Sequence, residues 1–218
     1  YSPFPPDIVM NAPHPDPVAR FRAAIDAFDA ANAQDPNTTL VDGQPVPNEL
    51  LYARRMSTWL DKLQPAASES LRLAVRCQHL CRWMIPRSSY PQTRLGYLEW
   101  RTALGRFHAD QAADILRSVG YDDATIARVG ALVRKQNLKA DPETQTLEDV
   151  ACLVFLENDF ADFATKHASE EPKVLNILAR TWKKMSERGR TAALELPLSK
   201  GERKLVEKAV GQASERPQ

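Results

Sequence analysis

The stretch from Arg76 to Arg101, RCQHLCRWMIPRSSYPQTRLGYLEWR, is dense in side chains that recognise anions and flat ligands. It holds five arginines, two tryptophans, two tyrosines and one histidine, against a single acid, Glu99. A guanidinium group binds phosphate or carboxylate through two parallel hydrogen bonds, and it stacks on aromatic rings. The composition of this stretch therefore predicts an anion-binding site.

Three side chains of metal-binding types fall on apolar faces of expected helices. A helix turns by 100° per residue, so His108 lies on a packed stripe that also contains Arg101. Asp149 shares a stripe with Leu153, where a carboxylate is costly unless it is paired, hydrogen-bonded or bound to a metal. His79 also points inward on its helix. If His79, His108 and Asp149 converge, they form a catalytic site that holds a divalent transition metal, namely Mn, Fe, Co or Zn.

Each of these side chains also has a structural interpretation. Asp149 can be a buried acid bonded to a neighbouring helix or an acid at the rim near a helix cap, and His79 can be a core histidine with a satisfied hydrogen bond. Some arginines can likewise pair with acids instead of a ligand: Arg76, Arg82 and Arg101 with Glu49, Asp61 or Asp149.

The candidate ligand-binding residues lie mostly in the same stretch. The loop PRSSYP is expected to form a rim over the cavity, and Glu148 is a secondary candidate beside it. The residues expected to bind the substrate are Arg82, Trp83, Arg87, Tyr90, Arg94, Tyr97, Arg101, Lys135 and Lys139.

Helical periodicity recurs along the chain, whereas strand signals are nearly absent. Cap residues and helix breakers divide the chain into seven or eight helices without a sheet. The pattern predicts a compact, all-α, single-domain bundle. The expected helices cover about 17–34, 48–63, 68–83, 94–119, 123–136, 147–167, 171–188 and the residues from 199 onward.

Composition divides the 218 residues into three expected parts. Residues 1–16 are rich in proline and are expected to form an extended or disordered arm, residues 17–198 the helical domain, and residues 199–218 a basic helix and tail. The chain has no apolar run near the roughly 18 residues of a membrane helix, and its start does not resemble a signal peptide. The three cysteines are expected to be reduced thiols, which favours a cytoplasmic protein.

Two of the cysteines, Cys77 and Cys81, stand four residues apart on one face of an expected helix. A zinc site would need two more ligands, and His79 points away from both. They are therefore expected to be small buried apolar residues.

The charge of the chain is uneven. Residues 172–218 contain eleven basic and five acidic residues, although the net charge of the whole chain is only +1. A basic C-terminal part can contact nucleic acid or an acidic partner, or it can be a solvated helical face.

Nearly the whole stretch from Phe21 to Leu198 resembles an uncharacterised family of bacteria and fungi. The matching motifs are QHLCRW, PRSSYP, GYLEWR, FHA, DPETQTLED, CLVFLE and TWKKMSERG. Some members carry the name glutamyl-tRNA synthetase, but this chain lacks the Rossmann-type organisation and the signature motifs of such an enzyme. The resemblance supplies no activity.

The pattern is also similar, more distantly, to the HD-domain superfamily of helical, metal-dependent phosphohydrolases. The resemblance places Tyr52, in YARRM, where that superfamily has its first histidine. It places His79 at the histidine of the His-Asp doublet, with Leu80 instead of the aspartate. His108, in FHADQAADIL, matches an additional histidine of many members, and Asp149, in LEDVACL, matches the late aspartate. Two of the usual metal ligands are thus replaced.

These observations favour an HD-like hydrolase of a small anionic phosphoester, such as a nucleotide. In one form a metal held by His79, His108 and Asp149 activates water; in a metal-free form His79 or His108 is the general acid–base and arginines stabilise the developing charge. The second hypothesis is a non-catalytic HD-like module that binds a nucleotide or another anionic metabolite. The third is an RNA or protein interaction through the basic C-terminal part, around TWKKMSERGR.

Overall fold

The computed structural model describes residues 16–215, and nearly all of their regular structure is helical. The elements are α1 (Pro17–Asn32), β1 (Thr38–Val41), β2 (Gln44–Pro47), α2 (Asn48–Leu63), α3 (Glu69–Arg76), the 3-10 helices η1 (Arg82–Met84) and η2 (Arg87–Ser89), α4 (Arg94–Ser118), α5 (Asp123–Val133), α6 (Pro142–Asn158), α7 (Phe160–Lys166), α8 (Glu171–Lys184), α9 (Glu187–Leu194) and α10 (Lys200–Glu215). The prediction of a compact, predominantly all-α fold is confirmed for these residues.

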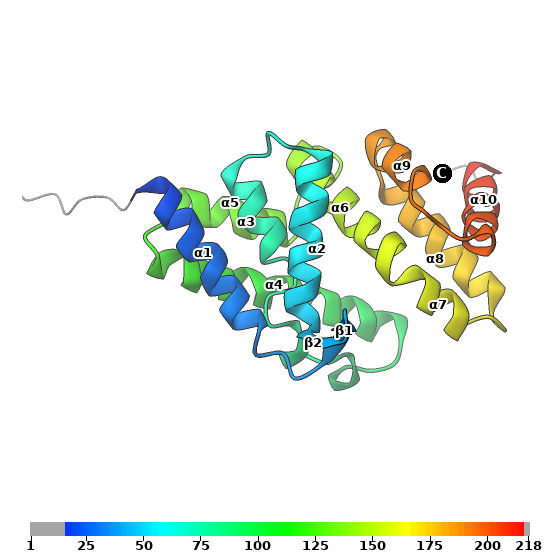
Figure 1. The fold of residues 1–218 in the computed structure, drawn as a ribbon, viewed down its shortest axis with the longest axis horizontal. Helices are drawn as coiled ribbons and strands as arrows, with labels where there is room; N and C mark the ends of the chain where they lie inside the picture. Colours follow the sequence, from blue (N-terminus) through cyan, green and yellow to red (C-terminus); the bar gives the residue numbers. More distant parts are fainter. Residues whose placement is uncertain (1–15, 216–218) are drawn as a thin grey trace, which may run out of the picture.

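The helices form two groups that meet where α2 packs against α6 (Figure 1). In the first group α3 packs against α2 and α5, and α4 runs along α5. In the second group α9 packs against α6, and α10 lies along α8. The segment from α2 to α6 therefore supplies the facing surfaces near the middle of the molecule, and this segment contains the arginine-rich stretch.

The core is built from the apolar faces of these helices. In α3, Leu71, Ala74 and Val75 are fully buried, while Arg72 and Arg76 of the same helix remain partly exposed. Burying one such leucine or valine stabilises the fold by about 1.5–3 kcal/mol. The largest fully buried side chains of the other helices include Phe28, Met56, Leu116, Leu132, Leu153 and Phe160.

A short β-hairpin precedes α2, so the prediction of no sheet is wrong at this point. Strands β1 and β2 pair antiparallel, with Val41 opposite Gln44. The two residues between them, Asp42 and Gly43, have φ angles of 51° and 78°. Two successive positive φ angles are typical of the tight type I′ turn that Asp-Gly favours. The second strand contains two prolines, which are rare in strands, so the sequence pattern does not indicate it.

The expected helix 68–83 ends early, at Arg76. The chain then turns, and Cys81 has a φ angle of 55°, a left-handed conformation that does not continue a helix. The buried side chain of Asn32 holds this turn, because its Oδ1 accepts a hydrogen bond from the Cys81 N–H at 3.0 Å. Cys77 and Cys81 therefore do not share a helix face, although both are buried free thiols, as predicted.

Several boundaries in the second half also differ from the prediction. Helix α6 begins at Pro142, and its cap is Asp141 instead of Thr146. The helix expected at 147–167 is interrupted at Asp159. The helix expected at 171–188 is interrupted before Ser186, which caps α9. These two interruptions bring the α-helices of residues 16–215 to ten, against the seven or eight predicted.

The predicted N-terminal arm, residues 1–16, lies outside the described residues except for Asp16. The Asp16 carboxylate accepts a hydrogen bond from the Val18 N–H at 3.2 Å and caps α1. The separation of a tail at 199–218 from the domain at 17–198 stays a prediction. Among the described helices, none is both long enough and apolar enough to cross a membrane.

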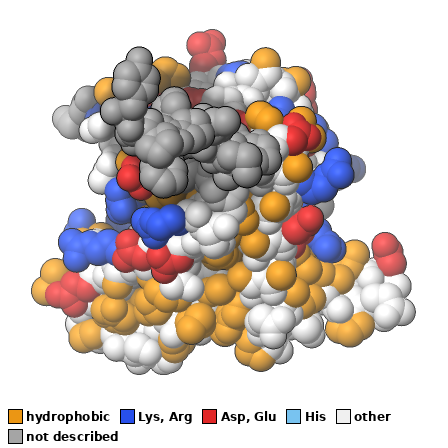
Figure 2. Space-filling model, turned by 90° about the vertical axis from the view of Figure 1, so that its left-hand side faces the viewer, with side chains coloured by type: hydrophobic (Ala, Val, Ile, Leu, Met, Phe, Trp, Pro, Cys, Tyr) orange, Lys and Arg blue, Asp and Glu red, His pale blue; other side chains and the backbone are white. Residues whose placement is uncertain are grey.

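Apolar side chains also reach the surface. Figure 2 shows them gathered over the lower part of one end of the molecule. Large exposed apolar side chains of the described chain include Met84 in η1 and Leu95, Tyr97 and Leu98 in the first turns of α4. The arginine-rich stretch therefore combines cations with exposed apolar groups.

Candidate active site

Four side chains from three elements form a cluster of titratable groups: Glu49 and Tyr52 on α2, His79 in the turn after α3, and His108 on α4. The Glu49 carboxylate lies 3.4 Å from His79 Nδ1. The Tyr52 ring stacks on the His79 imidazole, with centroids 4.0 Å apart and planes inclined by 9°. The His108 ring lies 5.9 Å from that of His79. The structure thus brings the two predicted histidines together and adds an acid and a tyrosine.

Asp35 positions the acid of this cluster. Pro47 stands at the cap position of α2 and supplies no side-chain cap. The buried Asp35 carboxylate fills that role by accepting hydrogen bonds from the Glu49 N–H at 3.1 Å and the Asn37 N–H at 3.0 Å. This arrangement satisfies a free amide of the helix end and fixes the turn from which Glu49 reaches His79.

The turn after α3 is fixed to α4 through His108. The Leu80 carbonyl oxygen lies 2.8 Å from His108 Nδ1. A carbonyl can only accept a hydrogen bond, so Nδ1 carries the proton and Nε2 has a free lone pair in the neutral ring. Leu80 itself is fully buried in the core. The same turn thereby presents His79 and orients the second histidine.

Burial changes the pKa values of the cluster in opposite directions. Burial, reinforced by Asp35, raises the pKa of Glu49 to about 7. Burial and nearby cations, of which Arg82 contributes most, lower the pKa of His79 well below its ordinary value. Burial and the neighbouring His79 lower the pKa of His108 to about 3. Both imidazoles are therefore neutral at neutral pH, and Glu49 gains and loses its proton in that range.

A cavity of about 430 Å³ opens beside the two histidines, between α4, the turn after α3 and the end of α5. We call it the arginine cavity. None of its lining residues is acidic. Its cations are Arg82, Arg101, Arg106, Arg134 and Lys135. Such a lining attracts an anion, since no carboxylate of the wall neutralises it.

A second cavity, of about 610 Å³, adjoins the first and extends to α6 and α8. The two share His79, Arg82, Arg101 and Lys135. We call this second one the aromatic cavity, because its wall includes Tyr52, Tyr97 and Phe155. It also differs from the first in containing two carboxylates, Glu148 and Asp159. A ligand that spans both cavities passes the His79 imidazole.

Glu148 of α6 holds two lysines at the aromatic cavity. Its carboxylate lies 2.5 Å from Lys135 Nζ and 3.4 Å from Lys184 Nζ. Burial alone raises the pKa of Glu148, but the two lysines, Lys135 first, outweigh it and keep this pKa below its ordinary value. Lys135 has a φ angle of 53°, which is rare for a residue with a side chain. The contact with Glu148 fixes this unusual turn at the end of α5.

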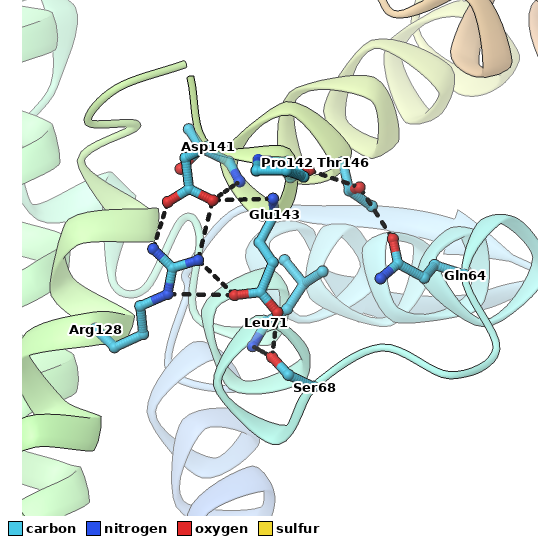
Figure 3. A network of polar contacts seen from close by, with 9 residues as sticks. Gln64, Ser68, Leu71, Arg128, Asp141, Pro142, Glu143 and Thr146 are labelled. Carbon is cyan, nitrogen blue, oxygen red and sulfur yellow. Dashed lines mark hydrogen bonds and ion pairs between the residues drawn. The ribbon is translucent and has the colours of Figure 1, made fainter. Parts of the chain in front are cut away.

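An ionic network anchors the beginning of α6 (Figure 3). Arg128 of α5 contacts the carboxylates of Asp141 and Glu143, and Glu143 also accepts a hydrogen bond from the hydroxyl of Ser68, the cap of α3. Arg128 holds the pKa of Asp141 well below its ordinary value. The network therefore joins α3, α5 and the beginning of α6, the helix that carries Glu148.

Asp149 is fully buried but points toward α9. Its carboxylate accepts hydrogen bonds from the Ser186 N–H at 2.7 Å, the Ser186 hydroxyl at 2.5 Å and the Gln145 amide at 3.0 Å. Gly189 approaches so closely that an added Cβ would lie 2.7 Å from Asp149 Cγ. These contacts fit the structural interpretation, a buried acid bonded to a neighbouring helix.

The three predicted metal ligands therefore do not form one site. Asp149 is engaged with α9, whereas His79 and His108 line the arginine cavity. Within residues 16–215, no three His, Cys, Asp or Glu side chains are grouped so that they could hold a metal ion. A bound Mn, Fe, Co or Zn ion stays a prediction, and the expected ligand set does not fit it.

The predicted ligand-binding residues divide into two groups. Those that line at least one of the two cavities are Arg82, Tyr97, Arg101 and Lys135. Those that line neither are Trp83, Arg87, Tyr90, Arg94 and Lys139. Arg87 is used within its own loop, where it donates to the carbonyl oxygens of Tyr90 at 2.9 Å and Pro91 at 2.7 Å.

The expectation that some arginines serve structure is confirmed for Arg76. Its guanidinium makes a two-point ion pair with Asp29 of α1, at 2.6 and 2.7 Å, instead of pairing with any of the acids expected. Arg82 lies over the Trp100 ring, 5.1 Å from its centre. Glu99, the single acid of the arginine-rich stretch, is exposed.

Sequence reasoning missed the role of Glu49 and of two cavity cations, Arg106 and Arg134. A signal for Glu49 was present, because Glu49, Tyr52 and Met56 recur at the helical spacing of one face. An acid in that stripe calls for a buried partner. No such signal exists for the two arginines, because both side chains are largely exposed and only the folded chain places them in the cavity wall.

The basic residues of the C-terminal part are divided between internal contacts and the surface. Lys184 faces Glu148, and Lys208 pairs with Glu171 at 2.7 Å. Lys183 is exposed. An interaction of this part with RNA or a protein stays a prediction.

Comparison with known proteins identifies a family for the chain. The model of a family described as a domain of unknown function, DUF4202, matches residues 22–206. No curated protein and no solved structure matches the chain.

Proposed function

We propose that this chain, which belongs to the DUF4202 family, is a hydrolase of a small anionic phosphoester and uses Glu49 and His79 as its acid–base pair. The observation that carries the proposal is the contact between these two side chains, 3.4 Å apart, together with the position of His79, which lines both cavities. A distant similarity to the HD-domain phosphohydrolases is part of the same proposal.

The cations supply binding and charge stabilisation. Arg82, Arg101 and Lys135 line both cavities, as His79 does. No ion pair with a carboxylate engages Arg82 or Arg101 within the described part of the chain, so their forks are available to a phosphoryl group. They also stabilise the negative charge that grows on the phosphoryl oxygens in the transition state.

His79 is the proton acceptor in this proposal. Water attacks phosphorus, the bond from phosphorus to the leaving oxygen breaks, and the proton passes from water through His79 to that oxygen. Burial depresses the pKa of His79 in the free protein, and the nearby cations depress it further. A bound anion offsets those cations, and the imidazole then becomes a stronger base when the substrate is present.

Glu49 supports this step from the other side of the ring. When ionised, it accepts the Nδ1–H of His79, leaves the lone pair on Nε2, and stabilises the imidazolium that forms. Its pKa of about 7 places this change of charge at physiological pH. Since the expected ligand set does not fit a metal, no step in this proposal depends on one.

Phosphate release by the purified full chain tests the proposal, with nucleotides and sugar phosphates as substrates. We expect His79→Asn to lower kcat at least 100-fold, the usual contribution of general acid–base catalysis. Arg101→Gln should raise KM about tenfold or more. Arg117→Gln, an exposed arginine of the same helix that pairs with Asp114, is the matched control and should leave both constants unchanged.

Two outcomes would contradict the proposal. Turnover that persists in His79→Asn would remove the acid–base assignment. Stoichiometric binding of a phosphorylated ligand without any turnover would instead identify the non-catalytic binding module.

A further inference from the structure

Four arginines in the wall of the arginine cavity form no ion pair with a carboxylate of residues 16–215: Arg82, Arg101, Arg106 and Arg134. The fifth cation of the wall, Lys135, is paired with Glu148 at 2.5 Å. Three of the four arginines are exposed, and Arg82 is half-buried. All four are therefore open to a ligand, and no acid of the described chain competes for them.

The charge of these four arginines exceeds that of a single phosphoryl group. Together they carry four positive charges, whereas a phosphate monoester carries about −1.5 to −2 at neutral pH. One such group balances about half of the positive charge, and two balance most of it. None of the described residues that line the cavity is acidic. Because binding sites complement the charge of their ligands, this wall favours a ligand with two phosphoryl groups.

The cations of the wall divide into two sets by position. Those that line both cavities also add to the effect of burial in lowering the pKa of His79: Arg82, Lys135 and Arg101. Arg106 and Arg134 line the arginine cavity alone. On α4, Arg101 and Arg106 are five residues apart, which separates them by about 7.5 Å along the helix axis. The two sets are thus suited to different parts of one ligand.

The second set, Arg106 and Arg134, comes from two helices that approach each other closely. Arg134 is the C-cap residue of α5. A Cβ at Gly105, the residue before Arg106, would lie 3.9 Å from Arg134 Cα and 4.0 Å from its Cγ. Arg134 therefore packs against the turn of α4 that carries Arg106, and the two basic residues are neighbours in the cavity wall.

We propose that Arg106 and Arg134 bind the second phosphoryl group of a substrate that carries two, while the reacting group lies beside His79 on the cations shared by both cavities. The aromatic cavity is less favourable for a second anion, because Glu148 and Asp159 belong to its wall. The volume of the arginine cavity, about 430 Å³, lies within the range of small-molecule sites. This inference rests on the proposed function and deepens it by naming the substrate class.

Calorimetric titration of the full chain tests the proposal with two matched pairs of probes. Fructose 6-phosphate and fructose 1,6-bisphosphate differ by a phosphoryl group on a carbon skeleton, and phosphate and methylenediphosphonate differ by one that is linked directly. The His79→Asn chain is used so that no probe is consumed. We expect the probe with two phosphoryl groups to bind about 30-fold or more tightly than its partner in at least one pair. The pair with the larger ratio distinguishes a bisphosphate from a diphosphate.

Arg106→Gln and Arg134→Gln separate this site from general electrostatic attraction. Each should weaken the binding of the preferred probe about tenfold or more, because a charged donor to phosphoryl oxygens is lost. Each should leave the affinity for the partner with one phosphoryl group within about threefold, since the shared cations hold that group. Arg117→Gln, the exposed arginine of α4 that pairs with Asp114, is the matched control and should change neither affinity.

A smaller preference in both pairs would overturn the second phosphoryl site and leave the proposed function standing with one phosphoryl group. Equal losses for both members of a pair in Arg106→Gln and Arg134→Gln, or no loss for either, would overturn it as well. If no probe binds, the anion site itself is wrong, and the proposed function fails with it. Circular dichroism establishes that each variant is folded, and either variant alone suffices for the test.

Discussion

A single carboxyl group, that of Glu49, has a pKa matched to physiological pH because of where the fold places it. Burial disfavours its charge, and Asp35 adds to the effect. Arg82 and His108 oppose it without cancelling it. The balance of these effects gives Glu49 a pKa of about 7. The Nδ1 atom of His79 lies 3.4 Å from its carboxylate. Perturbed pKa values of this kind are typical of functional sites.

The pH dependence of stability reports this balance. Between pH 4.5 and about 7 the folded chain holds a proton on Glu49 that the unfolded chain has released. The contribution of Glu49 to the free energy of unfolding therefore falls as pH rises through this range, by about 3 kcal/mol in all. Above pH 7 it no longer changes.

Glu49→Gln should abolish that fall, and urea unfolding of wild type and variant at several pH values measures it. His79 and His108 act in the opposite direction over the same range, since their pKa values are lowered. Only the difference between wild type and Glu49→Gln isolates the carboxyl group. A difference that is constant between pH 4.5 and 7 would mean that Glu49 has its ordinary pKa.

At the scale of the elements, the sequence pattern predicted where the helices lie but not where they are interrupted. The periodic stripes of α2 and α4 predicted those helices almost to the residue. The end of α3 was missed because the apolar pattern continues through Leu80, and the side chains that hold the turn, Asn32 and His108, are distant in sequence. His79 stands in that turn, so its exact direction could not be predicted from helical spacing.

The contact between α6 and α9 depends on a glycine. A Cβ at Gly189 would meet the Asp149 side chain at 2.7 to 3.0 Å, and Asp149 is held by three hydrogen bonds. We expect Gly189→Ala to destabilise the fold by about 1–3 kcal/mol, the usual cost of overpacking. Thermal unfolding measures the change.

Gly201→Ala is the matched control, since a Cβ at Gly201 in α10 would meet nothing within 4 Å. Alanine favours a helix more than glycine does, so this variant should be neutral or slightly more stable. If both variants unfold at the same temperature as wild type, the close packing of Asp149 against α9 is wrong.

At the scale of the whole molecule, the net charge is only +1, but the walls of the two cavities are rich in cations. The cavity cations come from η1, α4 and the chain after α5, and α8 adds Arg180 and Lys184. The sequence indicated His79, His108 and Arg101 through their types and helical phases, and Arg82 and Lys135 through their types alone. It could not indicate that Asp149 turns to α9, because both directions are compatible with one buried stripe. Convergence of side chains from separate helices is a property of the folded chain alone.

The titration of His79 in the presence of an anion shows whether its imidazole lies beside the anion-binding cations. Nuclear magnetic resonance of histidine-labelled protein follows each imidazole against pH, and His79→Asn identifies the resonance. We predict that the pKa of His79 lies well below 6.5 in the free chain and rises by at least one unit with saturating inorganic phosphate, because phosphate offsets Arg82, Lys135 and Arg101. A titration of His79 that phosphate leaves unchanged would contradict the account.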